Sequence, residues 1–221
     1  MTAPHPLAEL VEAAARGHYP EPDGAWRRLP PWREGIDAVV AFTGHAVFCL
    51  EGDVPDERLR VLGADGYGGA HKPQLIAEIA GPHAWVSSLD VLMVSRGTGG
   101  GGLVARPDLA GHPRVAYAAR LRSDVAVLGL PDPTRRAVAV LGRGVAGLRE
   151  LGVEVEPDRR AGGEGRALVR GALGSVPRGE LVVACVAPGN AASLRCLLSA
   201  GFTPVGAVQL VRRDAAPSAA A

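Results

Sequence analysis

Lysine is almost absent from this chain of 221 residues, in which Lys72 is the only lysine and arginine carries nearly all of the positive charge. The background is rich in alanine, glycine and proline, a bias that GC-rich coding produces, so the arginine count by itself is a weak sign of anion binding. Because the formal net charge is only +1, composition predicts no general attraction to nucleic acid or to an anionic membrane. The partner therefore has to be inferred from a local site.

Cysteine and paired metal ligands are also scarce. The three cysteines, Cys49, Cys185 and Cys196, are odd in number and show no CxxC spacing, which argues against a disulfide framework and against a zinc site. The six histidines show no i, i+4 pairing, so no metal is expected. This pattern is typical of a reducing compartment, and we expect the cytoplasm.

Long apolar runs are missing as well. No run approaches the ~20 residues of a membrane helix, and the N-terminal MTAPHPLAEL lacks the basic segment and apolar core of a signal peptide. The remaining composition, 47% hydrophobic and 21% charged residues, suits a soluble globular protein of one large or two small domains. We expect neither export nor membrane insertion.

The first half of the chain predicts short helices and one hairpin. Thr43 and Gly44 separate two β-rich runs and favour a hairpin turn, and Pro73 is well placed to begin a helix. The proline-rich segment 19–34 predicts an extended, ordered loop. The expected elements are helices at 6–14, 56–62 and 73–81 and strands at 36–42, 45–50 and 87–95.

Four consecutive glycines, Gly99–Gly102, have no helix signal beside them and are interpreted as a flexible loop or a domain boundary, which we place near residue 105. The expected organisation is a region 1–105, a domain 106–213 and a disordered tail 214–221. The fold class is α/β (α+β), with a mixed, mostly antiparallel central sheet flanked by helices. The elements expected in 106–213 are strands at 114–121, 125–130, 137–141, 148–156, 180–186, 202–205 and 207–212 and helices at 165–174 and 190–200.

Two glycine motifs compete as phosphate sites. Gly142, Gly144 and Gly147 have GxGxxG spacing, but a dinucleotide-binding unit needs ~30 residues including a crossover helix. Only 11 residues lie between Leu141 and Val153, too few for that helix, so a β-hairpin is expected here instead.

The second motif, RRAGGEGRAL at 159–168, stands between a strand and a helix. Backbone amides at a helix N-terminus attract phosphate, and glycine lets a ligand approach the backbone closely. No Gly-Lys-Ser/Thr follows, so the segment is not a Walker A loop. Taken alone, it is equally compatible with an ordinary helix start.

The segments LRELGVEVEPDRRAGGEGRALVRGAL and VACVAPGNAASLRCLLSAGFTPVG together resemble the GNAT N-acetyltransferase superfamily over residues 114–213. The resemblance rests on an Arg/Gln-x-x-Gly-x-Gly/Ala motif after a strand ending in VEP, and on an asparagine after the next strand. It implies a GNAT-like fold in which acetyl-CoA is the co-substrate and is bound without a metal. The residues implied to bind CoA are Val155, Arg160, Ala161, Gly162, Gly163, Gly165, Arg166, Asn190 and Ser193, with the amides of 161–166 holding the pyrophosphate.

The reaction implied by the resemblance needs a base that takes a proton from the amine and an acid that protonates the thiolate. Strand alternation places Glu150, Glu154 and Glu156 on one face, and family members often use a glutamate on this part of the sheet, so Glu150 and Glu154 are the candidate bases. A solvated strand face or ion pairs with arginines explains them equally well. Leu197 stands where many members carry a tyrosine acid, which leaves the proton donor open.

Two residues of the glycine segment depart from the family pattern. Gly162 replaces a residue that is commonly basic, and a carboxylate at Glu164 would repel a diphosphate by on the order of 1 kcal/mol unless it turns outward.

The resemblance implies an N-acetyltransferase acting on an amine of a small molecule or a peptide, and a homodimer is compatible with it. From composition we expect neither nucleic acid nor a membrane as a partner. The alternative is a non-catalytic CoA-binding or protein-interaction module with the same fold. Region 1–105 either completes the fold or shapes the acceptor site. The acceptor itself stays open because loops build such pockets.

Overall fold

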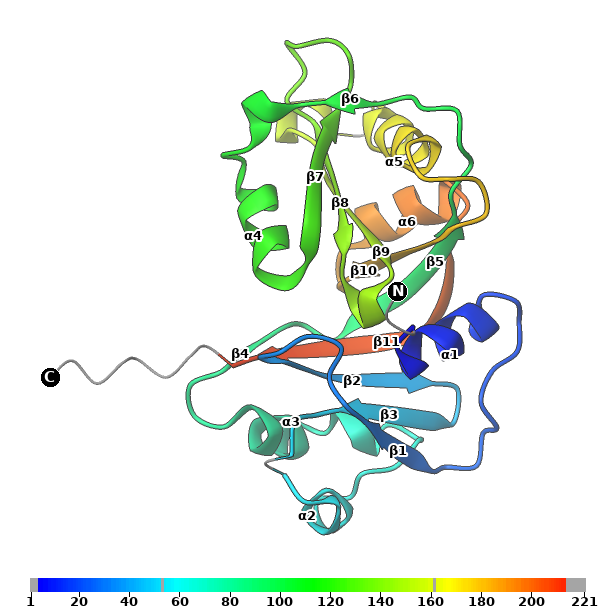
Figure 1. The fold of residues 1–221 in the computed structure, drawn as a ribbon, viewed down its shortest axis with the longest axis vertical. Coiled ribbons are helices and arrows are strands. Elements are labelled where there is room, and N and C mark those ends of the chain that lie inside the picture. Colours follow the sequence, from blue (N-terminus) through cyan, green and yellow to red (C-terminus); the bar gives the residue numbers. More distant parts are fainter. Residues whose placement is uncertain (1–3, 53, 161, 214–221) are drawn as a thin grey trace, which may run out of the picture. The chain divides into compact units, whose positions relative to one another are not determined.

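The computed structural model describes residues 4–52, 54–160 and 162–213, and it divides into two compact units (Figure 1). The first unit comprises residues 1–92 and 205–221, and the second comprises residues 93–204. The division falls within strands β5 (Asp90–Arg96) and β11 (Thr203–Arg212), not near residue 105. The C-terminal strand thus joins the first unit, which a boundary drawn from composition could not reveal. The tail expected at 214–221 lies outside the described residues.

The strands of the first unit lie in the order β1, β3, β2, β11 and β4, and the predicted hairpin is confirmed as an antiparallel pair of β2 with β3. Segment 26–29 is a strand, not a loop, because it pairs in parallel with β3 and packs the Trp26 ring edge-on against Phe48, with 5.2 Å between ring centroids. The helices and remaining strands of this unit are α1 (Pro6–Ala14), α2 (Asp56–Val61), α3 (Pro73–Ala80), β1 (Trp26–Leu29), β2 (Ile36–Phe42), β3 (His45–Cys49) and β4 (Trp85–Val86).

Two strand expectations near the C-terminus and at 87–95 need correction. β11 runs without a break where two short strands were expected, because Gly206 lets the strand approach Ala41, whose carbonyl oxygen would lie 2.4 Å from an added Cβ. The strand expected from Ser87 begins at Asp90, since the Ser87 hydroxyl accepts a hydrogen bond from the Leu210 amide at 2.9 Å.

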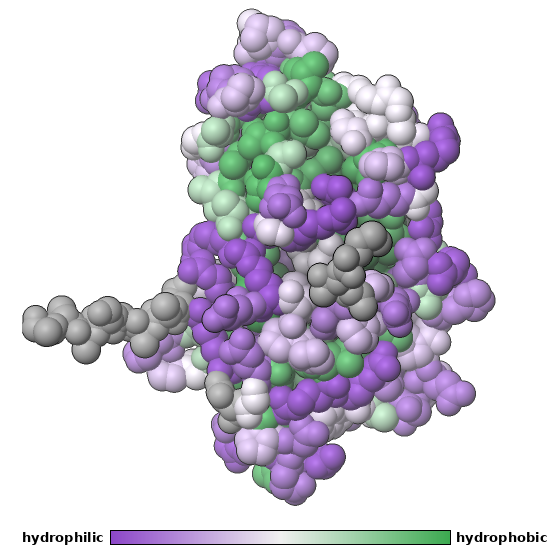
Figure 2. Space-filling view, viewed as in Figure 1, coloured by the Kyte–Doolittle hydropathy of each residue, from purple (hydrophilic) through white to green (hydrophobic). Residues whose placement is uncertain are grey.

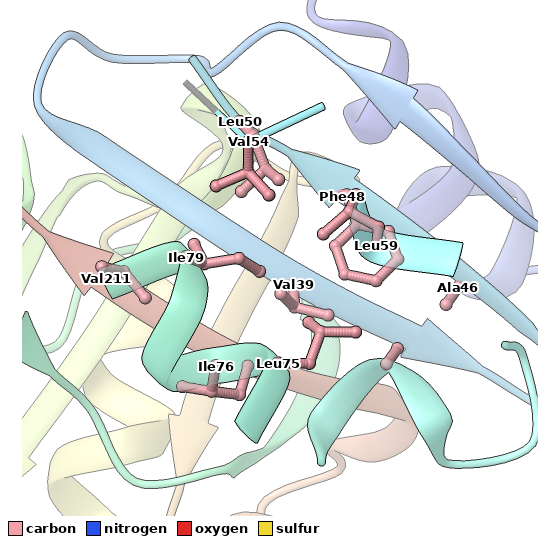
Figure 3. Close-up of a cluster of buried hydrophobic side chains, with 11 residues drawn as sticks. Val39, Ala46, Phe48, Leu50, Val54, Leu59, Leu75, Ile76, Ile79 and Val211 are labelled. Atoms are coloured by element: carbon pink, nitrogen blue, oxygen red, sulfur yellow. The ribbon is translucent and has the colours of Figure 1, made fainter. Parts of the chain in front are cut away.

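The core of the first unit lies between its sheet and helices α2 and α3. Figure 3 shows Leu75 and Ile79 of α3 on the side of the helix that faces Val39 of β2. Burying this apolar side is what stabilises so short a helix. The cluster consists of Val39, Ala46, Phe48, Leu50, Val54, Leu59, Ala70, Leu75, Ile76, Ile79 and Val211.

His71 makes the acid stability of the first unit depend on its ionisation. Neither ring nitrogen has a hydrogen bond of good geometry within the described residues, and burial lowers the pKa of His71, opposed only in part by the Gln209 amide. A base whose pKa falls on folding stabilises the fold above its unfolded pKa and loses that contribution as the pH falls. We expect the free energy of unfolding to drop below about pH 6.5.

Denaturant titrations at pH 7.5 and pH 5 measure this dependence. His71→Phe should flatten it, whereas His18→Asn, which removes an exposed histidine of the same unit, should leave it unchanged. An equal pH dependence in wild type and His71→Phe would contradict this assignment.

The second unit contains a run of neighbouring strands in the order β6, β7, β8, β9 and β10, antiparallel except for the last pair. The fold class is therefore confirmed as mixed α/β with mostly antiparallel pairing. In Figure 2 apolar side chains gather over β6 and β7, where Val104 is exposed. The remaining elements are β6 (Val104–Ala105), β7 (Ser123–Gly129), β8 (Val138–Arg143), β9 (Arg149–Glu154), β10 (Leu181–Val186), α4 (Pro113–Leu121), α5 (Glu164–Gly174) and α6 (Ala191–Ser199).

The strand expected at 114–121 is wrong, because this segment forms helix α4. Pro113 occupies the first helical position, and the His112 side chain caps the helix by accepting from the Arg114 amide at 3.0 Å. Val115, Ala118 and Leu121 recur every three residues and are buried on one side. The β-branched and aromatic residues that suggested a strand thus fit a helix, which the His112 cap and Pro113 begin.

The glycines at 97–102 form an ordered strap, not a flexible boundary. The amides of Thr98 and Gly101 donate to the carbonyls of Leu173 and Gly174 at 2.9 Å each, which satisfies the C-terminal end of α5. A Cβ on Gly174 would lie only 2.0 Å from the Gly101 oxygen. Glycine is therefore required for this close approach of two backbones.

The dinucleotide interpretation of Gly142–Gly147 is excluded, and the expected hairpin is confirmed. β8 and β9 pair antiparallel from Val138 with Glu154 to Arg143 with Arg149, and a single 3-10 turn, Val145–Gly147, joins them. No crossover helix intervenes.

No helix in 4–52, 54–160 and 162–213 is long and apolar enough to cross a membrane. Within the same ranges no group of three or more histidine, cysteine, aspartate and glutamate side chains is placed to hold a metal ion.

Candidate functional site

In the second unit, strand β9 is paired with β10 over only part of its length. The two parallel strands pair only at Val182 with Arg149 and Val183 with Glu150, whereas β8 stays paired with β9 as far as Glu154. Beyond Glu150, the β10-facing edge of β9 therefore lacks a strand partner among the described residues. Peptide groups on such an edge are free to bond an extended ligand that carries amides.

The chain continues from this edge into an uncapped helix start. After β9 a 3-10 turn, Pro157–Arg159, leads to Gly163, which has a φ of 84° and precedes the first residue of α5. Among the described residues no side chain caps this helix, and none lies within 4 Å of a Cβ placed on Gly163. The first amides of a helix have no partner within it and attract anions. We name residues 162–166 the glycine cradle; Ala161, expected to belong to it, lies outside the described residues.

Gly165 brings three elements of the site together. A Cβ on Gly165 would lie 3.2 Å from the Cys196 sulfur of α6 and 3.6 Å from a methyl group of Val155, just after β9. The absent side chain thus allows the start of α5 to pack against both neighbours. Burial raises the pKa of the Cys196 thiol, so a packing role fits this cysteine better than a reactive one.

Arg160 and Arg166 differ in their contacts. The Arg160 Nε atom donates to the Val155 carbonyl at 3.2 Å, which holds the turn between β9 and the glycine cradle. Arg166 is exposed and lies near enough to Cys196 to influence the thiol electrostatically. Arg160 thus lies just before the glycine cradle and Arg166 is its last residue, while the binding of CoA by both arginines stays a prediction.

Asn190 and Ser193 lie at the start of α6. The Asn190 side-chain oxygen accepts from the Ser193 amide at 3.1 Å, which is an N-cap, and both residues are on the surface. Their side chains are thus held at one end of α6, while their contact with pantetheine stays a prediction. Leu197, in the place of the tyrosine acid, is buried and packs as core.

Glu164 does not turn outward. Its side chain is only 7% exposed, and Oε2 accepts from Arg135 Nη1 at 2.8 Å, while Oε1 is buried without a partner among the described residues. Arg135 thus neutralises the carboxylate that was expected to weaken diphosphate binding. No pattern around Arg135 in the sequence pointed to this contact, since 29 residues separate the partners.

Buried Arg106 holds the loop that carries Arg135 by hydrogen bonds to its backbone. The Arg106 guanidinium donates to the carbonyls of Arg135 at 2.8 Å and Leu130 at 3.3 Å and forms an ion pair with Asp108 at 2.8 Å. The Arg136 amide also donates to Glu156 at 3.1 Å. These contacts place a basic loop beside the start of α5.

We expect Arg135→Met to weaken binding of an anionic ligand at the glycine cradle by about tenfold, because it leaves the Glu164 charge unpaired at the helix start. The double variant Arg135→Met/Glu164→Gln should recover most of this loss. Isothermal titration with CoA measures both affinities. If the two variants lost affinity equally, the loss would come from Arg135 itself and not from exposure of the Glu164 charge.

Glu150 is committed to a buried ion pair. Its Oε1 atom accepts from Arg122 Nη2 at 2.6 Å, its Oε2 accepts from the Val145 amide at 3.0 Å, and both side chains are almost fully buried. These contacts tie the turn between β8 and β9 to the end of α4. The geometry therefore favours a structural role for Glu150 over proton transfer.

Glu154 is the more accessible of the two candidate bases. Its side chain is 38% exposed and contacts Arg114 Nε at 3.3 Å. A Cβ on Gly152 would lie against both Arg122 and Arg114, the partners of Glu150 and Glu154, so the predicted alternation along β9 is confirmed for this face. Glu154 also follows the point where β10 leaves β9.

No known family model and no curated protein matches the chain. Solved structures of similar fold include a protein assigned to the GNAT family from Novosphingobium aromaticivorans, 22% identical, with a TM-score of 0.44 over 61% of this chain and 69% of that one. A GNAT-family acetyltransferase from Colwellia psychrerythraea is 13% identical, with a TM-score of 0.40 over 64% of this chain and 62% of that one. A GCN5-related N-acetyltransferase from Kribbella flavida is 15% identical, with a TM-score of 0.38 over 64% and 63%. The chain spans about two thirds of the length of each of these three structures.

Proposed function

We propose that this protein is an acetyl-CoA-dependent N-acetyltransferase that acts on an amine of a small molecule or a peptide. The observation that carries the proposal is the coincidence of an open β9 edge with an uncapped helix start a few residues later in the chain. A long ligand with amides at one end and a diphosphate at the other fits these two features, and CoA has this composition.

The residues present fit CoA in three places. Backbone amides of the glycine cradle would hold the diphosphate, and the β9 edge near Val155 would pair with the pantetheine amides. Asn190 and Ser193 would contact the pantetheine arm from the start of α6. Gly163 leaves open space where a side chain would block the approach of phosphate. When bound, acetyl-CoA supplies an acyl group activated as a thioester.

Glu154 would act on the acceptor amine. A protonated amine has no lone pair for attack, so the carboxylate first takes one proton from it. The amine nitrogen then forms a bond to the acyl carbon as the bond from that carbon to sulfur breaks, which yields an amide and the CoA thiol. The second amine proton reaches the sulfur through solvent, because Leu197 offers none.

The alternative function is a non-catalytic CoA-binding module, and the buried Leu197 is the observation that favours it. Both functions predict CoA binding but only one predicts turnover. They therefore differ in thiol release and not in affinity.

A thermal-shift titration with CoA and acetyl-CoA tests binding first. Ligand at ~100 times its dissociation constant should stabilise the fold by about 2.7 kcal/mol. The absence of a shift with either ligand would reject both CoA-based functions. Where a shift is seen, release of thiol from acetyl-CoA across a panel of amines supports the enzyme, and no release with any amine supports the module.

A further inference from the structure

Four charged side chains form a ladder between α4 and β9. Arg114 pairs with Glu154 at 3.3 Å, and Arg122 pairs with Glu150 at 2.6 Å. Gly152 lies between the two glutamates on the strand, where a Cβ would come within 3.1 Å of Arg122 Nη1 and 3.7 Å of Arg114 Cδ. Both arginines therefore converge on the same short stretch of β9, and we name Arg114, Arg122, Glu150 and Glu154 the charge ladder.

Arg122 has more hydrogen-bond donors than the chain satisfies. Its side chain is only 6% exposed, yet Nε and Nη1 are buried without a partner among the described residues, while Nη2 alone bonds Glu150. A guanidinium carries five N–H donors, and buried donors without acceptors cost free energy. The second oxygen of Glu150 accepts from the Val145 amide, so it does not bond Nε or Nη1 of Arg122. Arg122 Nη1 lies beside Gly152, which has no side chain that could accept a hydrogen bond.

The Arg114–Glu154 pair is placed to exchange partners. Both side chains are more than one third exposed, and an exposed pair at 3.3 Å contributes little to stability. The Arg114 guanidinium also lies over the Tyr117 ring, 5.7 Å from its centroid, which keeps it above the end of β9. A ligand that brings its own charges can therefore replace this pair at small cost.

We propose that the acceptor is a small zwitterion, an amine that carries a carboxylate a few bonds away, as in an amino acid; this rests on the proposed function. The carboxylate pairs with Arg114, and the ammonium pairs with Glu154, which then takes its proton. The two arginines and two glutamates of the charge ladder have no net charge. A zwitterion, which is also neutral, would break the Arg114–Glu154 ion pair and form two new ones, one with each residue. An amine without the carboxylate would take Glu154 and leave Arg114 unpaired.

A matched panel on the wild-type protein tests the substrate class. Each amino acid is compared with its amide and with the amine that lacks the carboxyl group, at saturating acetyl-CoA, by thiol release. We expect kcat/KM to be at least tenfold higher for the carboxylate form. Equal or higher values for the amides or the simple amines would overturn the inference.

Arg114→Gln tests the assigned residue. It should raise KM for the amino acid by about tenfold while changing KM for the matching amide little, so that the preference is lost. Arg120→Gln, which removes an exposed arginine of the same helix, is the control and should retain the preference. A preference that survives Arg114→Gln would remove Arg114 from the acceptor site.

Binding of the acceptor can also be measured without catalysis. A failure of this inference can then be distinguished from a failure of the proposed function. Thermal shifts with the same panel, with and without CoA, should favour the amino acid over its amide in the wild type. The absence of such a preference would overturn the inference even if CoA binds. A failure of CoA to bind would reject the proposed function while the acceptor measurement stands on its own.

Discussion

Gly163→Val is expected to abolish CoA binding while the second unit stays folded. Valine would place a branched side chain in the open space where a phosphate approaches the first amides of α5. The substitution also strains the backbone, because φ at Gly163 is 84°, and this costs roughly 1–2 kcal/mol. Isothermal titration with CoA should therefore show an affinity at least a hundredfold lower than wild type, with a moderate drop in Tm.

Gly179→Val separates the two effects of that substitution. Gly179 has nearly the same φ, 87°, and also has nothing within 4 Å of an added Cβ, but it lies in the turn between α5 and β10. The control should lose comparable stability and retain CoA affinity. If both variants lost CoA binding to the same degree, the loss would follow from backbone strain, and the glycine cradle would not be the phosphate site.

Glu154→Gln is expected to lower kcat by roughly 10²- to 10⁴-fold, because the amide cannot accept the amine proton. Glutamine keeps the size of the side chain, and since Glu154 is partly exposed, the stability of the fold should change by less than about 1 kcal/mol. CoA affinity should remain at the wild-type value. Steady-state thiol release at saturating acetyl-CoA measures the effect.

Glu150→Gln provides the contrast. Its partner Arg122 is buried, so removal of the negative charge should destabilise the fold by about 3–5 kcal/mol. The remaining folded protein should keep most of its kcat. A large loss of kcat in Glu150→Gln together with normal turnover in Glu154→Gln would reverse the assignment of the base.

Most local elements were predictable because their signals lie within a few residues. Pro73 begins α3, and Thr43 and Gly44 form the turn of the β2–β3 hairpin. The hairpin at Gly142–Gly147 was also predictable from chain length, since a hairpin needs fewer residues than a crossover helix. In each case the chain interacts with its immediate neighbours, and the pattern of residues reports that interaction directly.

The errors arose where contacts between distant segments decide the structure. The four glycines of the strap indicated flexibility, yet they are needed because α5 approaches them closely at Gly174. Trp26 lies in a proline-rich segment that becomes a strand only because β3 is there to pair with it. Neither partner lies close by in the sequence, so no local pattern could indicate the contact.

The sequence by itself determined that residues 162–166 lie between a strand and a helix, because the residues that begin a helix are a local signal. Only the tertiary structure decided the electrostatics around them. Arg135 neutralises Glu164, Arg122 holds Glu150 in a buried pair, and Glu154 stays accessible. Ion pairs join residues that are far apart in the chain, and whether a carboxylate is buried, paired or free depends on which elements the fold packs against it.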